Sequence, residues 1–252
     1  MNDSSPRTFT VRILRQDLPG KQGYWNEFRV EYEPDMNVIS ALQKIAESPV
    51  TTNSQDVAPV VWDCNCLEEV CGACTMVING RVRQACTALI DNLLKDNAHS
   101  IELRPMTKFP VVRDLMVDRE AFDRIIAAGG YVDVRTGSAI DANCIPIAKS
   151  DSDTSFDAAA CIGCGACVAS CKNASAMLFV AAKVSHLGHL PQGQPERDKR
   201  VLAMVRQMDA EGFGNCTNQY ECEAACPKEI SVDHIARLNR DYAMAVLREQ
   251  LV

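Results

Sequence analysis

The sequence predicts an α+β chain of two domains, with a sheet in residues 1–107 and only helices as regular structure in residues 108–252. Residues 25–33 alternate apolar and polar side chains, which is the period of a half-buried strand. Residues 173–187 instead place apolar side chains at helical spacing. Eleven of the 13 cysteines also fall into three spaced groups, one in the first domain and two in the second. Each domain is therefore expected to be organised around its own cysteines.

The first domain is predicted to begin with two strands and a helix. Residues 7–14 alternate weakly and form the first strand, residues 25–33 form the second, and a turn at residues 20–23 joins them. Asn37 is expected to cap a helix that ends at Pro49. Further strands are expected at residues 60–62, 75–78, 81–83 and 99–104, with a tight hairpin turn at residues 79–80. This order of elements resembles the β-grasp fold of plant-type ferredoxins.

Four cysteines between the predicted strands have the spacing of a two-iron site. They follow the plant-type order C-x4-C-x2-C…C, which holds a [2Fe–2S] cluster, and are Cys66, Cys71, Cys74 and Cys86. Gly72 lets the backbone come close to the cluster, so that its N–H can point at a sulfur atom. Cys64 lies outside this frame and is expected to be a buried small apolar residue.

The second domain is predicted from helical patterns and from the residues that begin and end them. Helices are expected at residues 118–128, at residues 173–187 with Gly188 closing the helix, from Pro195 onwards, and after a cap at Ser231. The last helix is expected to turn its apolar side chains inward at Ile235, Leu238, Tyr242 and Val246. Residues 135–157 are rich in Ser, Asp and Ala and are expected to form a surface loop.

Two cysteine groups in this domain form a pair. The first has the spacing C-x2-C-x2-C-x3-C that bacterial ferredoxins use for cubane clusters, and consists of Cys161, Cys164, Cys167 and Cys171. In such a run the first three thiolates hold one cluster and the fourth reaches across to a second. The second group repeats the frame with Gln219 in place of one cysteine, and consists of Cys216, Cys222 and Cys226, followed by Pro227.

Gln219 decides which clusters are expected. A cubane corner iron needs a soft thiolate, and an amide is a poor substitute, so the site beside Gln219 is expected to hold only three irons. The [4Fe–4S] ligands are then Cys161, Cys164, Cys167 and Cys226, and the [3Fe–4S] ligands are Cys171, Cys216 and Cys222. Structural zinc is the alternative, but seven cysteines with no nearby His do not divide into two four-ligand zinc sites. Cys144 is left as a buried or loop thiol.

Composition is that of a soluble globular protein from a reducing compartment. The chain has 252 residues, of which 47% are hydrophobic and 23% charged, a normal balance for a folded soluble protein. The N-terminus lacks the pattern of a signal peptide, and no stretch approaches the ~18 apolar residues of a membrane span. Residues 1–107 contain 10 basic and 14 acidic side chains and residues 108–252 contain 16 and 19, so neither half is basic and nucleic acid is not an expected partner.

Three clusters of different kinds in one chain indicate electron transfer. Each accepts one electron at a time, and the potential depends on cluster type, hydrogen bonding and exposure. The sequence contains no G-x-G-x-x-G and no Walker loop, so no flavin or nucleotide site is expected in this chain. Substrate chemistry is therefore expected on partner subunits.

These motifs together resemble the iron–sulfur subunits of succinate dehydrogenase and fumarate reductase. The resemblance covers essentially the whole chain and includes the segment Phe109-Pro-Val-Val-Arg-Asp-Leu115 between the domains. It implies a flavoprotein partner that carries FAD and the dicarboxylate site, and a membrane anchor that binds quinone, often with haem. It places the chain peripherally, on the cytoplasmic face of a bacterial membrane, with the [2Fe–2S] cluster towards the flavin and the [3Fe–4S] cluster towards the quinone.

Two positions depart from the family members that use ubiquinone. Those members carry Pro directly after the fourth cysteine of the first run, and a Trp soon after it, whereas Cys171 is followed here by Lys172 and Asn173. They also carry His after the next cysteine, where this chain has Thr217. The pattern is more similar to the menaquinone-linked members, whose single anchor subunit is a di-haem cytochrome b.

Other assignments remain open at this point. The same subunit could work in a quinol:fumarate reductase, in the opposite direction, or in a soluble heterodisulfide-reductase-like or thiol-linked fumarate reductase, and the clusters could also be structural staples of a binding module. The histidines are expected to have ordinary roles. His186 and His189 suit a surface or helix-capping position, although either could meet an anchor haem or a quinone, while His99 and His234 are expected at the surface.

Overall fold

The computed structural model describes residues 7–96, 99–134 and 147–250. The chain divides into two compact units, Met1–Asp118 and Arg119–Val252, and each is described by itself. The sequence placed the domain boundary after residue 107, whereas the first unit extends to Asp118. The extension arises because a small two-stranded sheet, β6 (Val111–Arg113) with β7 (Met116–Val117), belongs to the first unit.

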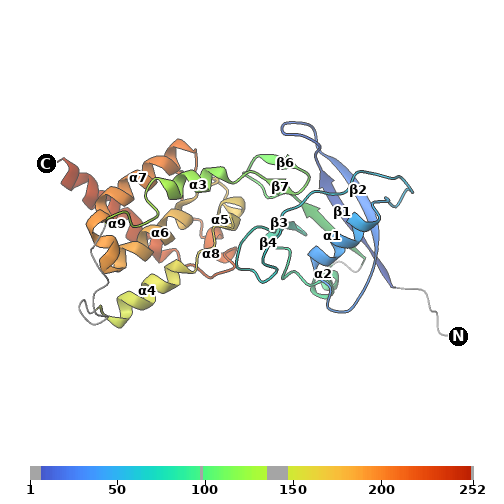
Figure 1. Cartoon of the computed structure of the whole chain (residues 1–252), viewed down its shortest axis with the longest axis horizontal. Helices are drawn as coiled ribbons and strands as arrows, with labels where there is room; N and C mark the ends of the chain where they lie inside the picture. The colour runs from blue at the N-terminus through green and yellow to red at the C-terminus, as the bar shows by residue number, and fades with distance from the viewer. Residues whose placement is uncertain (1–6, 97–98, 135–146, 251–252) are drawn as a thin grey trace. The chain divides into compact units, whose positions relative to one another are not determined.

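A mixed five-stranded sheet forms the first unit, in the order β2-β1-β5-β3-β4. The strands are β1 (Thr8–Arg15), β2 (Tyr24–Glu31), β3 (Thr75–Ile78), β4 (Arg81–Gln84) and β5 (Ser100–Arg104). The central β1 and β5 run parallel, and all other neighbours are antiparallel (Figure 1). This arrangement confirms the predicted β-grasp architecture. The predicted turn at Asn79 and Gly80 also forms, with φ of 48° and 76° at these residues, as a type I′ hairpin requires.

Helix α1 (Val38–Glu47) covers the sheet and closes the core of this unit. Its N-cap is Asn37, as predicted, because the Asn37 side chain accepts a hydrogen bond of 2.9 Å from the Ser40 N–H. One face of α1 packs into the same buried cluster as the inward side chains of β1 (Figure 1). A second short helix, α2 (Ile90–Asp96), was not predicted and contributes Leu93 and Leu94 to this core.

Residues 60–62, which were predicted to form a strand, are irregular and are held in place by a buried ion pair. The Arg15 guanidinium donates two hydrogen bonds to the Asp114 carboxylate, of 3.0 and 2.8 Å, and their side chains are 1% and 0% exposed. Asp114 also accepts the Val61 N–H at 2.9 Å, and the Val61 carbonyl accepts the Leu115 N–H. Because these partners occupy the backbone of Val61, this segment is irregular, and the prediction of a strand here was wrong.

The second unit contains only helices as regular structure in its described residues (Figure 1). They are α3 (Glu120–Ala127), α4 (Lys149–Ala159), α5 (Ala166–Ser170), α6 (Met177–His189), the 3-10 helix η1 (Pro191–Glu196), α7 (Arg197–Ala210), α8 (Glu221–Ala224) and α9 (Asp233–Glu249). Helix α6 is the central element, with nine buried residues, and it packs against α4, α7 and α9. The structure confirms the predicted fold class of a sheet-containing ferredoxin domain followed by a helical one.

Several boundaries in this unit differ from the prediction. The part of the expected loop at 135–157 that is described forms α4 from Lys149 onwards, while residues 135–146 lie outside the described residues. The helix predicted from Pro195 begins as η1 and becomes α-helical at Arg197. Gly188 lies within α6 rather than after it.

The last helix begins close to its predicted cap. Ser231 Oγ accepts a hydrogen bond of 3.2 Å from the Asp233 N–H, at the first residue of α9. Of the four side chains expected to face inward, Ile235 and Leu238 are buried, and Tyr242 and Val246 are half-buried.

Candidate metal centres

The loop from Cys66 to Cys74 is shaped so that backbone N–H groups converge on one sulfur. Leu67 and Glu69 both adopt left-handed backbone conformations, with φ of 62° and 57°. The Cys66 Sγ accepts hydrogen bonds from the N–H groups of residues 68, 70 and 71, at 3.4, 3.3 and 3.3 Å. These three hydrogen bonds, of which the one from the Glu68 N–H contributes most, lower the pKa of the Cys66 thiol to about 7. The loop therefore stabilises negative charge on this sulfur.

The other three cysteines of this group lie along the same loop and after β4. Cys71 Sγ accepts the Ala73 N–H at 3.4 Å. Cys74 and Cys86 are 4% and 5% exposed, and their side chains lie next to each other. Burial raises the pKa of the Cys74 thiol to about 12. The structure thus places Cys66 beside Cys71 and Cys74 beside Cys86, with the short loop 71–74 joining the two pairs.

Two cysteines, Cys64 and Cys144, were not assigned to any cluster. Cys64 is exposed, so the expectation of a buried apolar residue was wrong. It lies in the irregular stretch between Val61 and the cluster loop and is exposed there. Cys144 lies outside the described residues.

A cavity in the second unit brings together four predicted ligands. Its walls contain Cys161, Cys164, Cys167 and Cys226, with apolar side chains from Phe122, Leu178, Phe179 and Ile230. Phe122 and Phe179 stack with ring centroids 4.0 Å apart. Burial raises the pKa of the Cys161 thiol, raises that of Cys164 to about 11, and raises that of Cys167 well above its usual value. The fold thus brings Cys226 to the same cavity as Cys161, although 65 residues separate them in the sequence.

A second cavity brings together the remaining three cysteines. Its walls contain Cys171, Cys216 and Cys222, and Gln219 lines it as well. Asn173 donates a hydrogen bond of 2.6 Å to the Thr217 hydroxyl, which joins the two segments that carry these cysteines. Gln219, which holds the place of a cysteine in the repeated frame, therefore lines the same cavity as these three cysteines.

The donor sets fit iron–sulfur clusters better than single ions. Among the described residues, no three His, Cys, Asp or Glu side chains converge closely enough to hold one metal ion. The seven cysteines of the second unit instead line two pockets, and neither pocket is lined by a histidine. All-thiolate sets of four and three are suited to soft cubane clusters.

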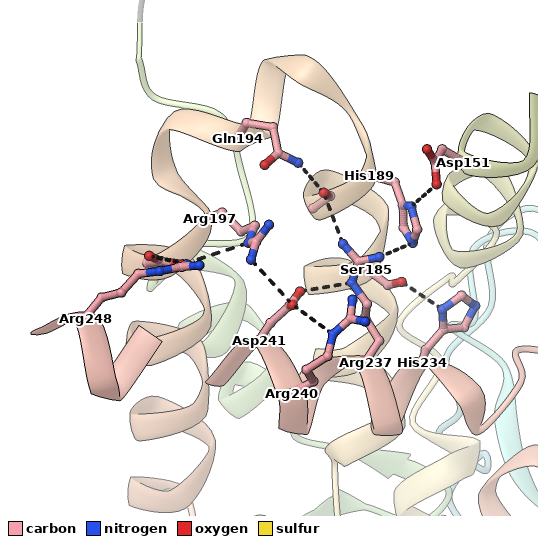
Figure 2. A network of polar contacts seen from close by, with 12 residues as sticks. Asp151, Ser185, His189, Gln194, Arg197, His234, Arg237, Arg240, Asp241 and Arg248 are labelled. Carbon is pink, nitrogen blue, oxygen red and sulfur yellow. Dashed lines mark hydrogen bonds and ion pairs between the residues drawn. The ribbon is translucent and has the colours of Figure 1, made fainter. Parts of the chain in front are cut away.

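The histidines are more involved in packing than the sequence indicated. His189 lies between α4 and α9, where its Nδ1 is 3.2 Å from an Asp151 carboxylate oxygen and its Nε2 is 2.8 Å from an Arg237 nitrogen (Figure 2). Because Arg237 can only donate, Nε2 accepts and Nδ1 carries the proton that it donates to Asp151. Burial lowers the pKa of His189. It thus joins three helices, α4, α6 and α9, in its neutral form.

His234 was expected at the surface and is buried instead. It is 6% exposed, and its Nδ1 lies 2.9 Å from the Ser185 hydroxyl (Figure 2). The partner on α6 explains the burial, since a polar ring can be buried when it is hydrogen-bonded. His186 is half-buried, and burial lowers its pKa, whereas His99 is exposed as predicted.

Sequence patterns alone did not reveal the polar residues that support the cysteine loops. Arg119 Nη1 lies 3.5 Å from the Cys164 carbonyl oxygen, and its positive charge acts to lower the pKa of the Cys164 thiol, against the larger effect of burial. Thr75 and Gln84 form a buried hydrogen-bonded pair, and Thr75 also bonds to the Gly72 carbonyl in the loop between Cys71 and Cys74. Their only signal in the sequence is that Thr75 directly follows a cysteine and stands opposite Gln84 across the predicted hairpin.

Two family models and several known proteins match the chain. The model of a 2Fe-2S iron-sulfur cluster binding domain matches residues 10–124, and that of a 4Fe-4S dicluster domain matches residues 157–230. The succinate dehydrogenase iron-sulfur subunit of Bacillus subtilis is 38% identical, over 97% of this chain and 96% of the relative. The 8-methylmenaquinol:fumarate reductase iron-sulfur subunit of Wolinella succinogenes is 27% identical, over 90% of this chain and 71% of the relative.

A solved structure shares the fold. A chain of the Mycobacterium smegmatis Sdh1 complex in the apo form matches with a TM-score of 0.69 at 20% identity, and the match covers 95% of this chain and 97% of that one.

In the described part of the chain, no helix combines the length and the apolar character needed to cross a lipid bilayer.

Proposed function

Because this chain belongs to the family of iron–sulfur subunits of succinate dehydrogenase and fumarate reductase, we propose that it serves a membrane-bound complex that oxidises succinate and reduces quinone. Electron transfer by iron–sulfur clusters follows from membership of the family. The direction is the proposal, and it is supported by the higher identity to a succinate dehydrogenase subunit, 38%, than to a fumarate reductase subunit, 27%. Quinol:fumarate reduction is the alternative direction.

The ligand sets rest on one observation above all, namely that the two cavities of the second unit separate seven cysteines into four and three. Cys161, Cys164, Cys167 and Cys226 would hold [4Fe–4S], and Cys171, Cys216 and Cys222 would hold [3Fe–4S] beside Gln219. In the first unit, Cys66, Cys71, Cys74 and Cys86 would hold [2Fe–2S]. When bound, the clusters accept and donate single electrons over a wide range of potentials.

The chain's own residues prepare these sites in three ways. Backbone N–H groups of the first loop point at Cys66 and stabilise negative charge on its sulfur. Apolar side chains, including the stacked Phe122 and Phe179, limit the access of water to the four-cysteine cavity. The Arg119 guanidinium places positive charge close to Cys164. Each feature would change the relative stability of the oxidised and reduced states of the bound cluster and so contribute to its reduction potential.

Substrate and quinone chemistry would belong to partner subunits. A flavoprotein with FAD would carry the succinate site, and a membrane anchor, a di-haem cytochrome b, would bind menaquinone near the three-cysteine cavity. Three residues support this assignment because they stand where the ubiquinone-linked members carry other residues: Thr217, which lines that cavity, and Lys172 and Asn173, which directly follow Cys171. The complex would hold this chain at the cytoplasmic face of the membrane.

The test of this function separates electron transfer from quinone reduction. The complex of this chain with the flavoprotein, prepared without the anchor, is expected to reduce an artificial dye with succinate and to leave quinone unreduced. Dye can take electrons from the flavin or the clusters, whereas quinone needs a pocket that the anchor completes. Quinone reduction by this two-subunit complex, at the rate of the full enzyme, would contradict the proposal. Rapid fumarate reduction with slow succinate oxidation by the full enzyme would favour the alternative direction.

Cys66 and Cys64 provide a matched pair for testing the first ligand set. Cys66→Ser is expected to abolish the [2Fe–2S] electron paramagnetic resonance (EPR) spectrum or to change it strongly, because Cys66 occupies the ligand position and receives three N–H bonds. Cys64→Ser is expected to leave the spectrum intact, because Cys64 lies outside the frame and is exposed. Spectra of the reduced proteins decide the question. Equal damage by both substitutions would mean that the frame is misassigned.

A further inference from the structure

Two buried polar side chains connect the β3–β4 hairpin to the first cysteine loop by hydrogen bonds. The Thr75 hydroxyl donates a hydrogen bond of 2.8 Å to the Gly72 carbonyl oxygen, and the Gln84 side-chain amide donates one of 3.2 Å to the Thr75 hydroxyl oxygen. Thr75 is 4% exposed and Gln84 is 2% exposed. The two residues face each other across the β3–β4 hairpin, so the sheet fixes their positions. Together they connect the rigid sheet to the backbone of the loop.

The hydrogen bond to Gly72 also determines where the next N–H points. A trans peptide unit is planar, and its C=O and N–H groups point in opposite directions. When Thr75 holds the Gly72 carbonyl, the N–H of Ala73 in the same peptide unit is directed to the other side, where Cys71 Sγ accepts it at 3.4 Å. Gly72 adopts a φ of 71°, a conformation that glycine tolerates without strain. The peptide is thus held from both sides.

We propose that Thr75 and Gln84 are positioning residues that raise the reduction potential of the [2Fe–2S] cluster by aiming the Ala73 N–H at the Cys71 sulfur. The inference rests on the proposed role of Cys71 as a cluster ligand. Reduction adds negative charge to the cluster and its sulfur ligands. An N–H···S bond stabilises the more negative state, so each such bond raises the potential. A residue that keeps the N–H in place therefore acts on the potential without touching the cluster.

Thr75→Val is the decisive substitution because it removes the hydroxyl and preserves a β-branched side chain of similar size. Without the hydroxyl, the Gly72 carbonyl loses the hydrogen bond from Thr75, and the Gly72–Ala73 peptide is expected to rotate away from Cys71. In EPR-monitored redox titrations of the holo-protein, the ratio of reduced to oxidised [2Fe–2S] at the wild-type midpoint is expected to fall about tenfold, which corresponds to about 59 mV for a one-electron couple. The midpoints of the other two clusters should not move.

Matched variants separate positioning from packing. Thr75→Ser retains the hydroxyl and is expected to keep the wild-type potential. Gln84→Leu removes the group that orients the hydroxyl and should shift the potential in the same direction by a smaller amount. Thr51→Val removes another buried threonine hydroxyl of this unit, which accepts the Gln55 N–H at 3.2 Å, and should leave the potential unchanged.

The outcomes distinguish this inference from the ligand assignment. An unchanged potential in Thr75→Val, or an equal shift in Thr75→Ser, would overturn the positioning role. If Thr75→Val fails to bind the cluster, the Gln84→Leu variant provides the test. A wild-type [2Fe–2S] potential in Gln84→Leu would overturn the positioning role. The ligand assignment is tested separately by Cys71→Ser. If that change leaves the [2Fe–2S] spectrum unaltered, Cys71 is not a ligand, whatever the threonine variants show.

Discussion

Asp114→Ala is expected to destabilise the first unit by about 3–5 kcal/mol, the usual result of removing one partner of a buried ion pair. The substitution leaves the Arg15 guanidinium buried without its carboxylate, and it removes the acceptor of the Val61 N–H. Arg15 keeps the carbonyl oxygens of Ala58 and Pro59, at 2.7 and 3.2 Å, but no counter-charge. The loss should appear as a lower midpoint of urea unfolding, followed by circular dichroism.

Two variants control for this prediction. Glu33→Ala removes an exposed partner of Lys44 and is expected to change stability by less than about 1 kcal/mol, as surface pairs do. The double change Arg15→Met with Asp114→Ala should recover part of the loss, because no unpaired charge remains. A loss below about 1 kcal/mol for Asp114→Ala alone would show that the buried pair does not hold this unit together.

Gln219→Cys is expected to convert the three-iron centre into a four-iron one. Gln219 lines the cavity of Cys171, Cys216 and Cys222 and occupies the place of the missing cysteine in the frame. A thiolate there would supply the ligand that a fourth iron needs. The isotropic EPR signal of the oxidised [3Fe–4S] centre should disappear, and the iron content should rise. The potential of the centre should also fall, because a fourth thiolate adds negative charge.

Gln219→Ala is the matched control for the conversion. It removes the amide without adding a ligand, so the three-iron signal should remain. If Gln219→Cys retains the wild-type signal and iron content, residue 219 does not stand at the open corner. Two [4Fe–4S] clusters in the unsubstituted protein would contradict the three-iron assignment itself.

Cysteine spacing was sufficient to predict which residues would meet in the second unit. The rule that the fourth cysteine of one run joins the other cluster foresaw the grouping of Cys226 with Cys161, and of Cys171 with Cys216, that the two cavities show. Alternation and the Asn-Gly turn likewise predicted most of the sheet. These signals are local or have a fixed spacing, which is why sequence carries them.

Features that depend on distant partners could not be predicted. Residues 60–62 form no strand because the carboxylate of Asp114, more than 50 residues later, accepts the N–H of Val61. Helix α4 has little apolar pattern and owes its place to α6, where Ser155 donates to the His186 carbonyl at 2.9 Å. His234 is buried because Ser185 happens to face it. In each case a partner far along the chain overrides the local preference.

The cluster loop has a consequence for how such a protein can change in evolution. Its amides point inward to Cys66, while the side chains of Leu67 and Val70 point outward and are 51% and 57% exposed. Substitutions at these positions that preserve the backbone conformation alter the outer surface and leave the N–H···S bonds as they are. At Val70 the backbone N–H therefore bonds to the Cys66 sulfur, while the side chain of the same residue forms part of the exposed surface. A lineage can acquire a new partner at this face without retuning the potential of its cluster.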